Sequence, residues 1–418
     1  MKALNNDIYK NLDMPLKGIR EMCIKKGIAF PEITKAVRTG DTPQHERQKM
    51  LKKPPHILIT TPESLFLMLT SVKAHTMLRN VKYLIVDEIH SMIGTKRGVH
   101  LALSIERLEQ LSSHDIVRIG LSATINPIER AAAYLGGYER TESGYKKRMV
   151  NIVNPKMERK KDLKIILPVD DFQDLEEGTV WPEIYKTIIE LVKKHKSTIV
   201  FVNNRATAEK IALNINNIED SELCMPHHGS MSKSKRLKIE DDFKSGKIKC
   251  LIATSTLELG IDIGHVELMI QVSPPNTVSS GLQRLGRAGH SITATSTGRI
   301  IPRTRGDLLR AAFMCMEMIE GNIETENIPL NCLDVLSQHI VSICCSGKWN
   351  QEDVFDLVRC AYPYNSLNRQ DFIKVLSMLA GDYEHMEDIP AKPRIIWNRQ
   401  EGTIEGNTYS RMLAVSSG

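Results

Sequence analysis

The chain has 418 residues, of which 41% are apolar and 25% are charged. This composition is typical of a globular protein and excludes a disordered or fibrous chain, and the length predicts two or three domains. The 56 Lys and Arg residues against 50 Asp and Glu give a formal charge of +6, which is compatible with a polyanionic partner but too small to predict one. No apolar run reaches the ~18 residues of a membrane-spanning helix, so we expect no membrane span. The eight cysteines include no Cys-x-x-Cys pair, which favours reduced thiols in a cytoplasmic protein over a zinc site or a disulfide framework.

Apolar runs that alternate with amphipathic stretches predict a first α/β domain over residues 1–150. Its β-rich runs are His56–Thr60, Tyr83–Val86 and Val117–Leu121. Near-continuous apolar runs of this kind are typical of a parallel sheet covered on both faces. The basic stretch Tyr145–Lys164 is predicted to be a linker or connecting strand region that leads to the next domain.

The same pattern begins again after this stretch and predicts a second α/β domain over residues 151–305. The strand candidates are Thr198–Val202, Lys249–Thr254 and Leu268–Val272. Two α/β domains in tandem are the simplest fold that accounts for the repeated alternation.

Helices dominate from residue 306 to residue 418. Apolar residues recur at helical spacing at Leu333, Leu336, Ile340 and Ile343, and again at Phe372, Val375, Leu376 and Leu379. Asn350 and Asn368 each precede acidic residues, which is typical of helix N-caps. The segment Arg394–Arg411 alternates like a hairpin with Gly402 and Gly406 as turn residues, so this third domain is predicted to be winged-helix-like.

Two adjacent carboxylates, Asp87 and Glu88, directly follow the strand candidate Tyr83–Val86. Parallel sheets bind ligands at the carboxyl ends of their strands. There Asp87 can hold Mg²⁺ through water, and Glu88 can take a proton from an attacking water. A solvated acidic turn explains these residues equally well. Ser122-Ala123-Thr124 follows the next strand candidate, but this tripeptide alone indicates little.

Arg284 and Arg287 are three residues apart and are predicted to share one face of a helix. Two guanidinium groups aimed at one place can neutralise charge that develops on a transferred phosphoryl group. The alternative is a basic surface helix. In the segment Thr254–Asp262, hydroxyl groups and backbone amides are candidates to contact phosphates and Asp262 is a candidate to accept from a sugar hydroxyl, although a plain polar loop explains the segment too.

In chain order, these segments resemble the motifs of superfamily 2 helicases of the DExH type. The segments are Thr61–Glu63, Asp87–His90, Ser122–Thr124, Phe201–Arg205, Thr256–Asp262 and Gln283–Arg287. Further segments are similar to the Lhr (large helicase-related) family, namely Lys2–Asp7, Thr60–Leu65, Arg97–His100, Gln283–His290, Ala361–Tyr364, Gly402–Ile404 and Arg411–Ala414. The ordered set covers nearly the whole chain.

The resemblance implies an ATP-dependent helicase or translocase in which two RecA-like parallel-sheet domains, the first incomplete, bind ATP between them and a winged-helix-like domain follows. Asp87 and Glu88 would handle Mg²⁺ and the hydrolytic water, Gln283 would order that water, and Arg284 and Arg287 would reach the γ-phosphate. The remaining nucleotide contacts would come from His90, Ser122, Thr124, Gly260 and Asp262. The backbone of a single-stranded or forked nucleic acid, DNA rather than RNA, would be held by Thr61, Asn203, Arg205 and Thr256.

The sequence departs from the family pattern in its phosphate-binding loop. The family carries a G-x-x-x-x-G-K-[ST] loop upstream of Ala3–Asn6, and the 418 residues contain no Gly-Lys-Thr or Gly-Lys-Ser. We therefore expect a fragment of a longer helicase that hydrolyses ATP poorly by itself, with the strand before Ser122 at an open sheet edge. Two alternatives remain: a non-enzymatic nucleic-acid-binding fragment, or one part of a split helicase completed by a separate upstream P-loop-containing polypeptide.

Overall fold

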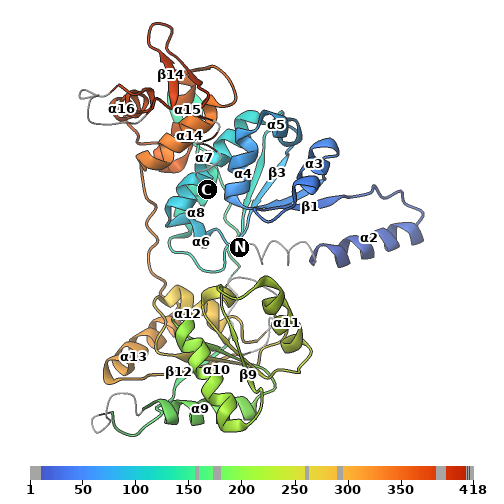
Figure 1. The fold of residues 1–418 in the computed structure, drawn as a ribbon, viewed down its shortest axis with the longest axis vertical. Helices are drawn as coiled ribbons and strands as arrows, with labels where there is room; N and C mark the ends of the chain where they lie inside the picture. Colours follow the sequence, from blue (N-terminus) through green and yellow to red (C-terminus); the bar gives the residue numbers. More distant parts are fainter. Residues whose placement is uncertain are drawn as a thin grey trace. The chain divides into compact units, whose positions relative to one another are not determined.

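The chain divides into two compact units, both built on parallel β-strands. The computed structural model describes residues 11–155, 160–172, 180–258, 263–289, 295–382, 392–410, 412 and 414. Unit 1 spans residues 1–122, 127–153 and 326–418, and unit 2 spans residues 123–126 and 154–325. Figure 1 shows both units and labels several of their helices and strands. Within the described ranges, none of the helices combines the length and the apolar character needed to cross a bilayer.

The α/β part of unit 1 contains two pairs of parallel strands and an antiparallel hairpin. The strands are β1 (Lys35–Arg38) paired with β2 (Ile57–Thr60), β3 (Tyr83–Val86) paired with β4 (Val117–Gly120), and the hairpin β5 (Tyr138–Thr141) and β6 (Gly144–Lys147). The helices are α2 (Asp13–Lys25), α3 (Gln44–Lys52), α4 (Pro62–Thr70), α5 (Val72–Leu78), α6 (His90–Ile93), α7 (Lys96–Leu111) and α8 (Ile128–Gly136). The three strands predicted in this region are confirmed to within one residue at each end.

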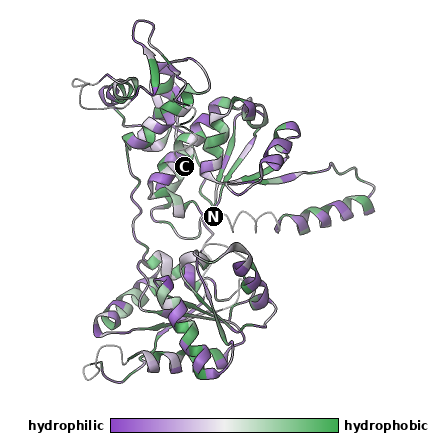
Figure 2. Ribbon diagram, in the orientation of Figure 1, coloured by the Kyte–Doolittle hydropathy of each residue, from purple (hydrophilic) through white to green (hydrophobic). Residues whose placement is uncertain are grey.

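Helix α2 buries none of its residues, although it is amphipathic. Figure 2 shows it banded in hydrophilic and hydrophobic colours along its length. Its apolar side chains Ile19 and Met22 are both about half exposed, at 49% and 57%. The buried core of this part lies instead under α4 and α7, where Phe66, Met68 and Leu103 are enclosed.

The β3–β4 sheet has one covered and one uncovered face. On the uncovered face the register pairs Tyr83 with Val117 and Ile85 with Ile119. Between 38% and 67% of each of these four side chains is exposed, and Leu121 is exposed as well. The prediction of a sheet covered on both faces is therefore wrong for β3–β4 in the part of the chain that the structure describes.

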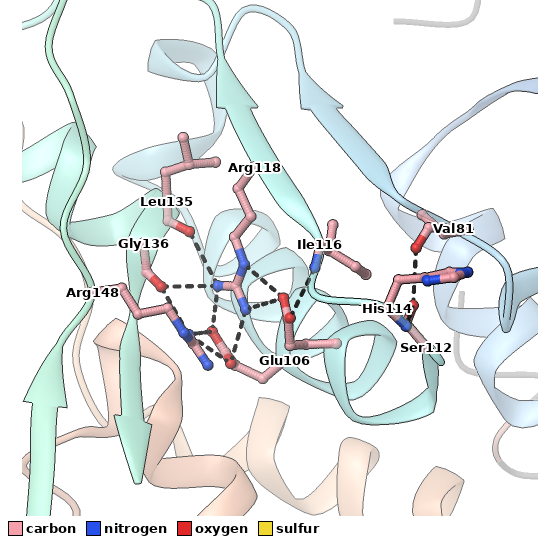
Figure 3. Close-up of polar contacts among 10 residues, drawn as sticks. Val81, Glu106, Ser112, His114, Ile116, Arg118, Leu135, Gly136 and Arg148 are labelled. Carbon is pink, nitrogen blue, oxygen red and sulfur yellow. Dashed lines mark hydrogen bonds and ion pairs between the residues drawn. The ribbon is translucent and has the colours of Figure 1, made fainter. Parts of the chain in front are cut away.

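A network of charged side chains holds β4 to α7 and α8 on the covered face. Arg118 of β4 donates to the carboxylate of Glu106 and to the backbone oxygen of Gly136, as Figure 3 shows. Arg118 also donates to the carboxylate of Glu109. Arg148 donates to Glu106 and to the same backbone oxygen. Burial raises the pKa of the Glu106 carboxyl, and the two arginines oppose that shift. The buried carboxylate is thus paired with two cations, which is how proteins tolerate an ionised group in the interior.

The C-terminal part of unit 1 is a helical module with a three-stranded antiparallel sheet. Its elements are α14 (Leu333–Cys344), β13 (Trp349–Asn350), α15 (Gln351–Cys360), α16 (Arg369–Ala380), β14 (Ile395–Asn398) and β15 (Thr403–Gly406), with strand order β13-β15-β14. Both predicted caps are confirmed: the Asn350 side chain accepts from the amide of Glu352 at 2.8 Å, and that of Asn368 accepts from the amide of Asp371 at 2.8 Å.

The two glycines of the predicted hairpin have different roles. Gly402 has a φ of 65° and forms the turn before β15, as predicted. Gly406 is not a turn residue but the last residue of β15. A Cβ atom at position 406 would lie 2.8 Å from the backbone oxygen of Cys344, so glycine is required there by the close approach of β15 to the end of α14.

This helical module packs against the α/β part of unit 1. Helix α14 contacts α4 and α7, and α15 contacts α7 and β5. Lys96 forms an ion pair with Asp334 at 2.6 Å, and the Tyr145 hydroxyl donates to Asp356 at 2.5 Å. Unit 1 therefore joins residues from both ends of the chain in one body.

Unit 2 contains a six-stranded sheet in which every neighbouring pair is parallel. The order is β7 (Lys161–Ile165), β12 (Ser296–Ile301), β11 (Leu268–Val272), β8 (Thr198–Phe201), β10 (Cys250–Ala253) and β9 (Cys224–His227). The helices are α9 (Val180–Lys194), α10 (Arg205–Glu219), α11 (Lys233–Lys244), α12 (Val278–Leu285) and α13 (Arg305–Glu320), with a 3-10 turn η1 (Ser255–Leu257). The predicted second α/β body is confirmed. The stretch expected to connect the domains holds the end of β6 and most of β7.

Candidate functional site

The acidic pair predicted from the sequence lies at the carboxyl end of the β3–β4 sheet. Asp87 and Glu88 follow β3 directly, and Ser122 follows β4 by two residues. Val86 pairs with Gly120, so both strands end at the same edge. Nδ1 of His90 lies 3.1 Å from the Ser122 hydroxyl, and Nε2 of His90 lies 3.4 Å from Oε2 of Glu88. The structure therefore brings four of the predicted nucleotide-site residues together.

The backbone of Glu88 adopts an uncommon conformation. Its φ is 51°, a left-handed value that residues other than Gly, Asn and Asp rarely adopt. Its amide donates to Oδ1 of Asp87 at 2.9 Å. Strained backbone of this kind gathers at functional sites, where the surrounding structure enforces it.

Burial and neighbouring groups shift the pKa values of Asp87 and His90 in opposite directions. Burial raises the pKa of Asp87, and the neighbouring Glu88 raises it further, against the hydrogen bond from the Glu88 amide. Burial lowers the pKa of His90, and Glu88 opposes that shift. Because a cation would relieve the repulsion between the two carboxylates, this edge favours a bound positive charge.

Thr61 lies at the end of β2 and has a structural role in this arrangement. Its hydroxyl caps α4 by accepting from the amide of Ser64, and the residue is only 6% exposed. No hydrogen bond or ion pair between Thr61 and Asp87–His90 occurs in the described residues. A nucleic-acid contact of its side chain stays a prediction.

A second cluster lies at the carboxyl edge of the unit 2 sheet. Phe201, Ala253 and His227 end three neighbouring strands in register. Asn203 and Arg205 follow the first of these strands and are exposed, and Thr256 follows the second. Arg205 donates to the Ser230 hydroxyl at 2.9 Å, while the Thr256 hydroxyl lies 3.1 Å from Nδ1 of His227. Predicted nucleic-acid contacts that are far apart in the sequence thus share one sheet edge.

Thr124 and Gln283 lie in direct contact within unit 2. Nε2 of Gln283 donates to the Thr124 hydroxyl at 2.9 Å, and the Ser279 hydroxyl lies 3.0 Å from that of Thr124. The two predicted nucleotide-site residues are therefore linked by hydrogen bonds, and Ser279 joins them.

Arg284 is held inside unit 2. It is 4% exposed; its Nε donates to Oε1 of Glu258 at 2.7 Å, and its Nη1 donates to Oε1 of Gln271 at 2.6 Å. Arg287 donates to the backbone oxygen of Glu258 at 3.0 Å. The prediction that both arginines share one helix is wrong, because α12 ends at Leu285. They nevertheless converge on the same residue.

The structure adds residues that the sequence did not single out. Glu258 and Gln271 bind Arg284, and a buried His227–Glu240 pair lies behind Thr256. The one signal for Glu258 in the sequence was its position, two residues after the predicted nucleic-acid contact Thr256. Gly260, Asp262 and His290 lie outside the described residues. The described residues contain no group of three or more His, Cys, Asp or Glu arranged to hold a metal.

Three family models match the chain in sequence. They are the DEAD/DEAH box helicase model over residues 1–131, the helicase conserved C-terminal domain over residues 183–291, and the winged helix domain of the large helicase-related protein over residues 316–417. The matches fall on the acidic cluster, on the unit 2 sheet edge and on the C-terminal helical module.

Relatives in bacteria and archaea match nearly the whole chain. The Lhr helicase/probable uracil glycosylase of Mycolicibacterium smegmatis is 41% identical over 100% of this chain and 29% of its own length. The ATP-dependent helicase Lhr-Core of Methanothermobacter thermautotrophicus is 42% identical over 93% of this chain and 45% of its own length. The chain therefore spans less than half the length of either relative.

Solved structures extend this similarity to the fold. The structure of the Mycobacterium smegmatis helicase Lhr bound to ssDNA and AMP-PNP matches 99% of this chain and 53% of that chain, with 42% identity and a TM-score of 0.90. The DUF1998 helicase MrfA bound to DNA and AMPPNP matches in fold alone, with 23% identity and a TM-score of 0.73. The two parallel-sheet bodies are thus RecA-like and the C-terminal module is a winged helix. The chain belongs to the Lhr family of DExH helicases.

Proposed function

We propose that this chain contributes to an ATP-dependent motor that moves along single-stranded nucleic acid, with DNA as the natural strand. The observation that carries this proposal is the Asp87–Glu88 pair at the carboxyl end of β3, held by a left-handed backbone at Glu88. The ssDNA and AMP-PNP bound to the Mycobacterium smegmatis Lhr structure support ATP and DNA as ligands. We also propose three domains, over residues 1–150, 151–305 and 306–418, and a cytoplasmic setting in which the eight free cysteines stay reduced.

The acidic cluster fits a magnesium–nucleotide complex. One oxygen of Asp87 accepts from the Glu88 amide, which leaves the other free to bind a water of a hydrated Mg²⁺. When bound, Mg²⁺ would neutralise charge on the phosphates. Glu88 would accept the proton of the hydrolytic water, and the contact of His90 with Ser122 would link that end of the site to the end of β4.

On unit 2 we assign the phosphate-facing role to Arg287 and not to Arg284. The guanidinium of Arg284 is buried and paired with the carboxylate of Glu258. Turning Arg284 toward a phosphate would break this buried pair, and breaking such a pair costs about 3–5 kcal/mol. Arg284 would instead hold Glu258, whose backbone oxygen accepts from Arg287. Gln283, already bonded to Thr124, would order the attacking water. Nucleotide contacts of Gly260 and Asp262 rest on the family resemblance.

Asn203, Arg205 and Thr256 would hold the phosphate backbone of a single strand. They combine one cation with an amide and a hydroxyl at the edge of the unit 2 sheet. Contacts of this kind do not read base sequence, and their affinity falls as salt rises.

The 418 residues contain no phosphate-binding Gly-Lys-Thr or Gly-Lys-Ser segment, so we propose that they hydrolyse ATP weakly by themselves. The uncovered apolar face of β3–β4 supports a second candidate, in which a P-loop-containing polypeptide packs on unit 1 and completes the site. The four apolar side chains of the pairs Tyr83–Val117 and Ile85–Ile119, together with the exposed Leu121, give that partner an apolar surface to bury.

An ATPase assay tests the proposal. We expect slow turnover of ATP by the 418-residue chain, stimulated by single-stranded DNA and abolished by Glu88→Gln. Glu139→Gln, an exposed carboxylate of β5, is the control and should leave the rate unchanged. Turnover that Glu88→Gln does not alter, or no binding of single-stranded DNA at low salt, would contradict the proposal. Rapid turnover after addition of a P-loop-containing polypeptide would favour the split enzyme.

A further inference from the structure

A small cavity lies within unit 1, between the first RecA-like body and the winged helix. Its volume is about 60 Å³, which is room for several water-sized groups. Leu69 of α4 and Arg107 of α7 line it from the RecA-like side, and Ile343 of α14 and Trp349 of β13 line it from the winged-helix side. The described residues that line it include none of the proposed nucleotide or strand contacts.

Arg107 brings a buried positive charge to the wall of this cavity. The residue is only 7% exposed. Its Nη2 donates to the backbone oxygen of Leu69 at 3.2 Å, and its Nη1 lies 3.4 Å from Nδ1 of His339. The guanidinium carbon lies 5.6 Å from the centre of the Phe66 ring. Among the described residues, no Asp or Glu forms an ion pair with Arg107, so all its partners are uncharged groups.

These partners leave the charge of Arg107 without a counter-ion. Burial lowers the pKa of Arg107 to about 9, so the guanidinium still carries its proton at neutral pH. Its two hydrogen bonds use two of five N–H donors. Buried charges in proteins are normally paired, as Arg118 is with Glu106 and Glu109. Arg107 therefore combines an unpaired buried charge, spare donors and an adjacent cavity.

We propose that this cavity binds a small inorganic oxyanion of the sulfate or phosphate class, with Arg107 as its counter-charge. Gln110, one turn further along α7 and exposed, also lines the cavity, so its amide is a second donor in reach of the anion. Because the cavity walls come from both α7 and the winged helix, the bound anion would strengthen the joint between them. The phosphate of a nucleic-acid strand has the same chemistry, but its sugars need more room than the cavity offers.

Thermal unfolding of the full 418-residue chain tests the site, with sulfate as the probe. Tryptophan fluorescence follows unit 1 through Trp349 and Trp397, and sodium gluconate, whose anion is too large for the cavity, keeps the ionic strength constant. We expect the melting temperature to rise and then level off, by about 3–6 °C at ten times the dissociation constant. Arg107→Met should lose this rise. Exclusion of sulfate from the protein surface would instead raise it without levelling off, and equally in both chains.

Gln110→Glu tests the site even where Arg107→Met does not fold, because position 110 is exposed. Its carboxylate would pair with Arg107, so this variant should melt at a higher temperature without sulfate and should not respond to sulfate further. Arg205→Met, at the proposed strand edge of unit 2, is the control for anion binding there and should keep the full response. A response that Gln110→Glu retains, or one that Arg205→Met abolishes, would overturn the proposal, as would a rise that never levels off.

Oligo-dT distinguishes the two sources of the anion. Added in place of sulfate, it should give the same change in melting temperature in the unchanged chain and in Gln110→Glu, because a strand does not enter the cavity. A change that Gln110→Glu loses would assign the cavity to a strand phosphate and would contradict the assignment to a free inorganic ion.

Discussion

The hydroxyl oxygens of Thr70 and Ser342, 272 residues apart in the sequence, lie 2.6 Å from each other in the interior of unit 1. Thr70 ends α4 and also donates to the backbone oxygen of Phe66 at 2.8 Å, so the Ser342 hydroxyl is the donor between the two. Ser342 lies on α14 of the winged helix and is fully buried. This buried hydrogen bond joins the winged helix to the first RecA-like body, in addition to the Lys96–Asp334 ion pair and the Tyr145–Asp356 hydrogen bond.

We expect Thr70→Val to lower the free energy of unfolding by about 1–3 kcal/mol, because the buried Ser342 hydroxyl would lose its acceptor. Urea unfolding followed by tryptophan fluorescence measures this change, since Trp349 and Trp397 lie in the winged helix. Ser337→Ala, on the same helix but bonded only to the backbone oxygen of Leu333, is the control and should change stability far less. Equal effects of the two substitutions would contradict this account of the joint.

Acid should destabilise unit 1 through its buried histidines. Burial lowers the pKa of His100 to about 4, and Arg107 adds to the shift. The unfolded chain therefore binds a proton near its ordinary value of about 6.5, while the folded chain does not until the pH approaches 4, so stability is lost as pH falls through this window. Between about pH 7.5 and pH 5 we expect a loss of about 2 kcal/mol from His100. Burial also lowers the pKa of His339, whose ring lies 4.4 Å from that of His100, and it adds to the same trend.

Unfolding free energies of His100→Gln at the two pH values check this prediction. The variant should depend less on pH than the unchanged chain does. His45→Gln, at an exposed position of α3, should leave the pH dependence as it was. A pH dependence that His100→Gln does not reduce would refute the assignment.

The charged network in Figure 3 should make Glu106 one of the most sensitive positions of unit 1. Replacing Glu106 by Gln leaves the buried guanidinium of Arg118 and the partly exposed one of Arg148 beside a neutral amide. Breaking a buried pair costs about 3–5 kcal/mol, and we expect the lower end of that range because Arg118 keeps its ion pair with Glu109. Thermal unfolding should show the loss. Glu139→Gln removes an exposed partner of Lys146, and we expect about 0–1 kcal/mol there.

The uncovered face of β3–β4 should drive self-association. Ile85 and Ile119 lie opposite each other and are 60% and 38% exposed. Replacing both by Ser should reduce light scattering at high concentration, because large exposed apolar patches favour association. Two exposed apolar residues of α10, Leu213 and Ile218, give a control pair whose replacement by Ser should change scattering much less. Scattering that stays the same after the Ile85 and Ile119 changes would locate the contact elsewhere.

Strands with β-branched or other apolar runs were predictable from the sequence, whereas strands of mixed composition were not. Strand β11 (Leu268–Val272) matches its prediction at both ends because all five residues are buried. Strand β9 has the sequence Cys-Met-Pro-His, in which Pro226 argues against a strand inside a sheet. Pro226 is tolerated because β9 is the edge strand of the sheet. The local sequence pattern does not show which strand lies at the edge of a sheet.

The same limit applies to the site. Asp87 and Glu88 were recognisable because they follow an apolar strand, and their position is set by that strand. The role of Glu258 depends on Arg284, 26 residues further along the chain, and that of Glu240 depends on His227, 13 residues before it. Pairs of this kind exist only after the sheet has brought the strand ends together.

The left-handed backbone at Glu88 sets the thermal stability of the protein against the presence of its catalytic carboxylate. Glycine adopts that conformation without strain, so Glu88→Gly should raise the melting temperature while leaving no carboxylate to accept a proton. Glu88→Gln, which keeps a side chain at the same φ, should be equally inert but should melt below the glycine variant. The substitution Glu88→Gly is thus expected to give a more stable protein that does not hydrolyse ATP.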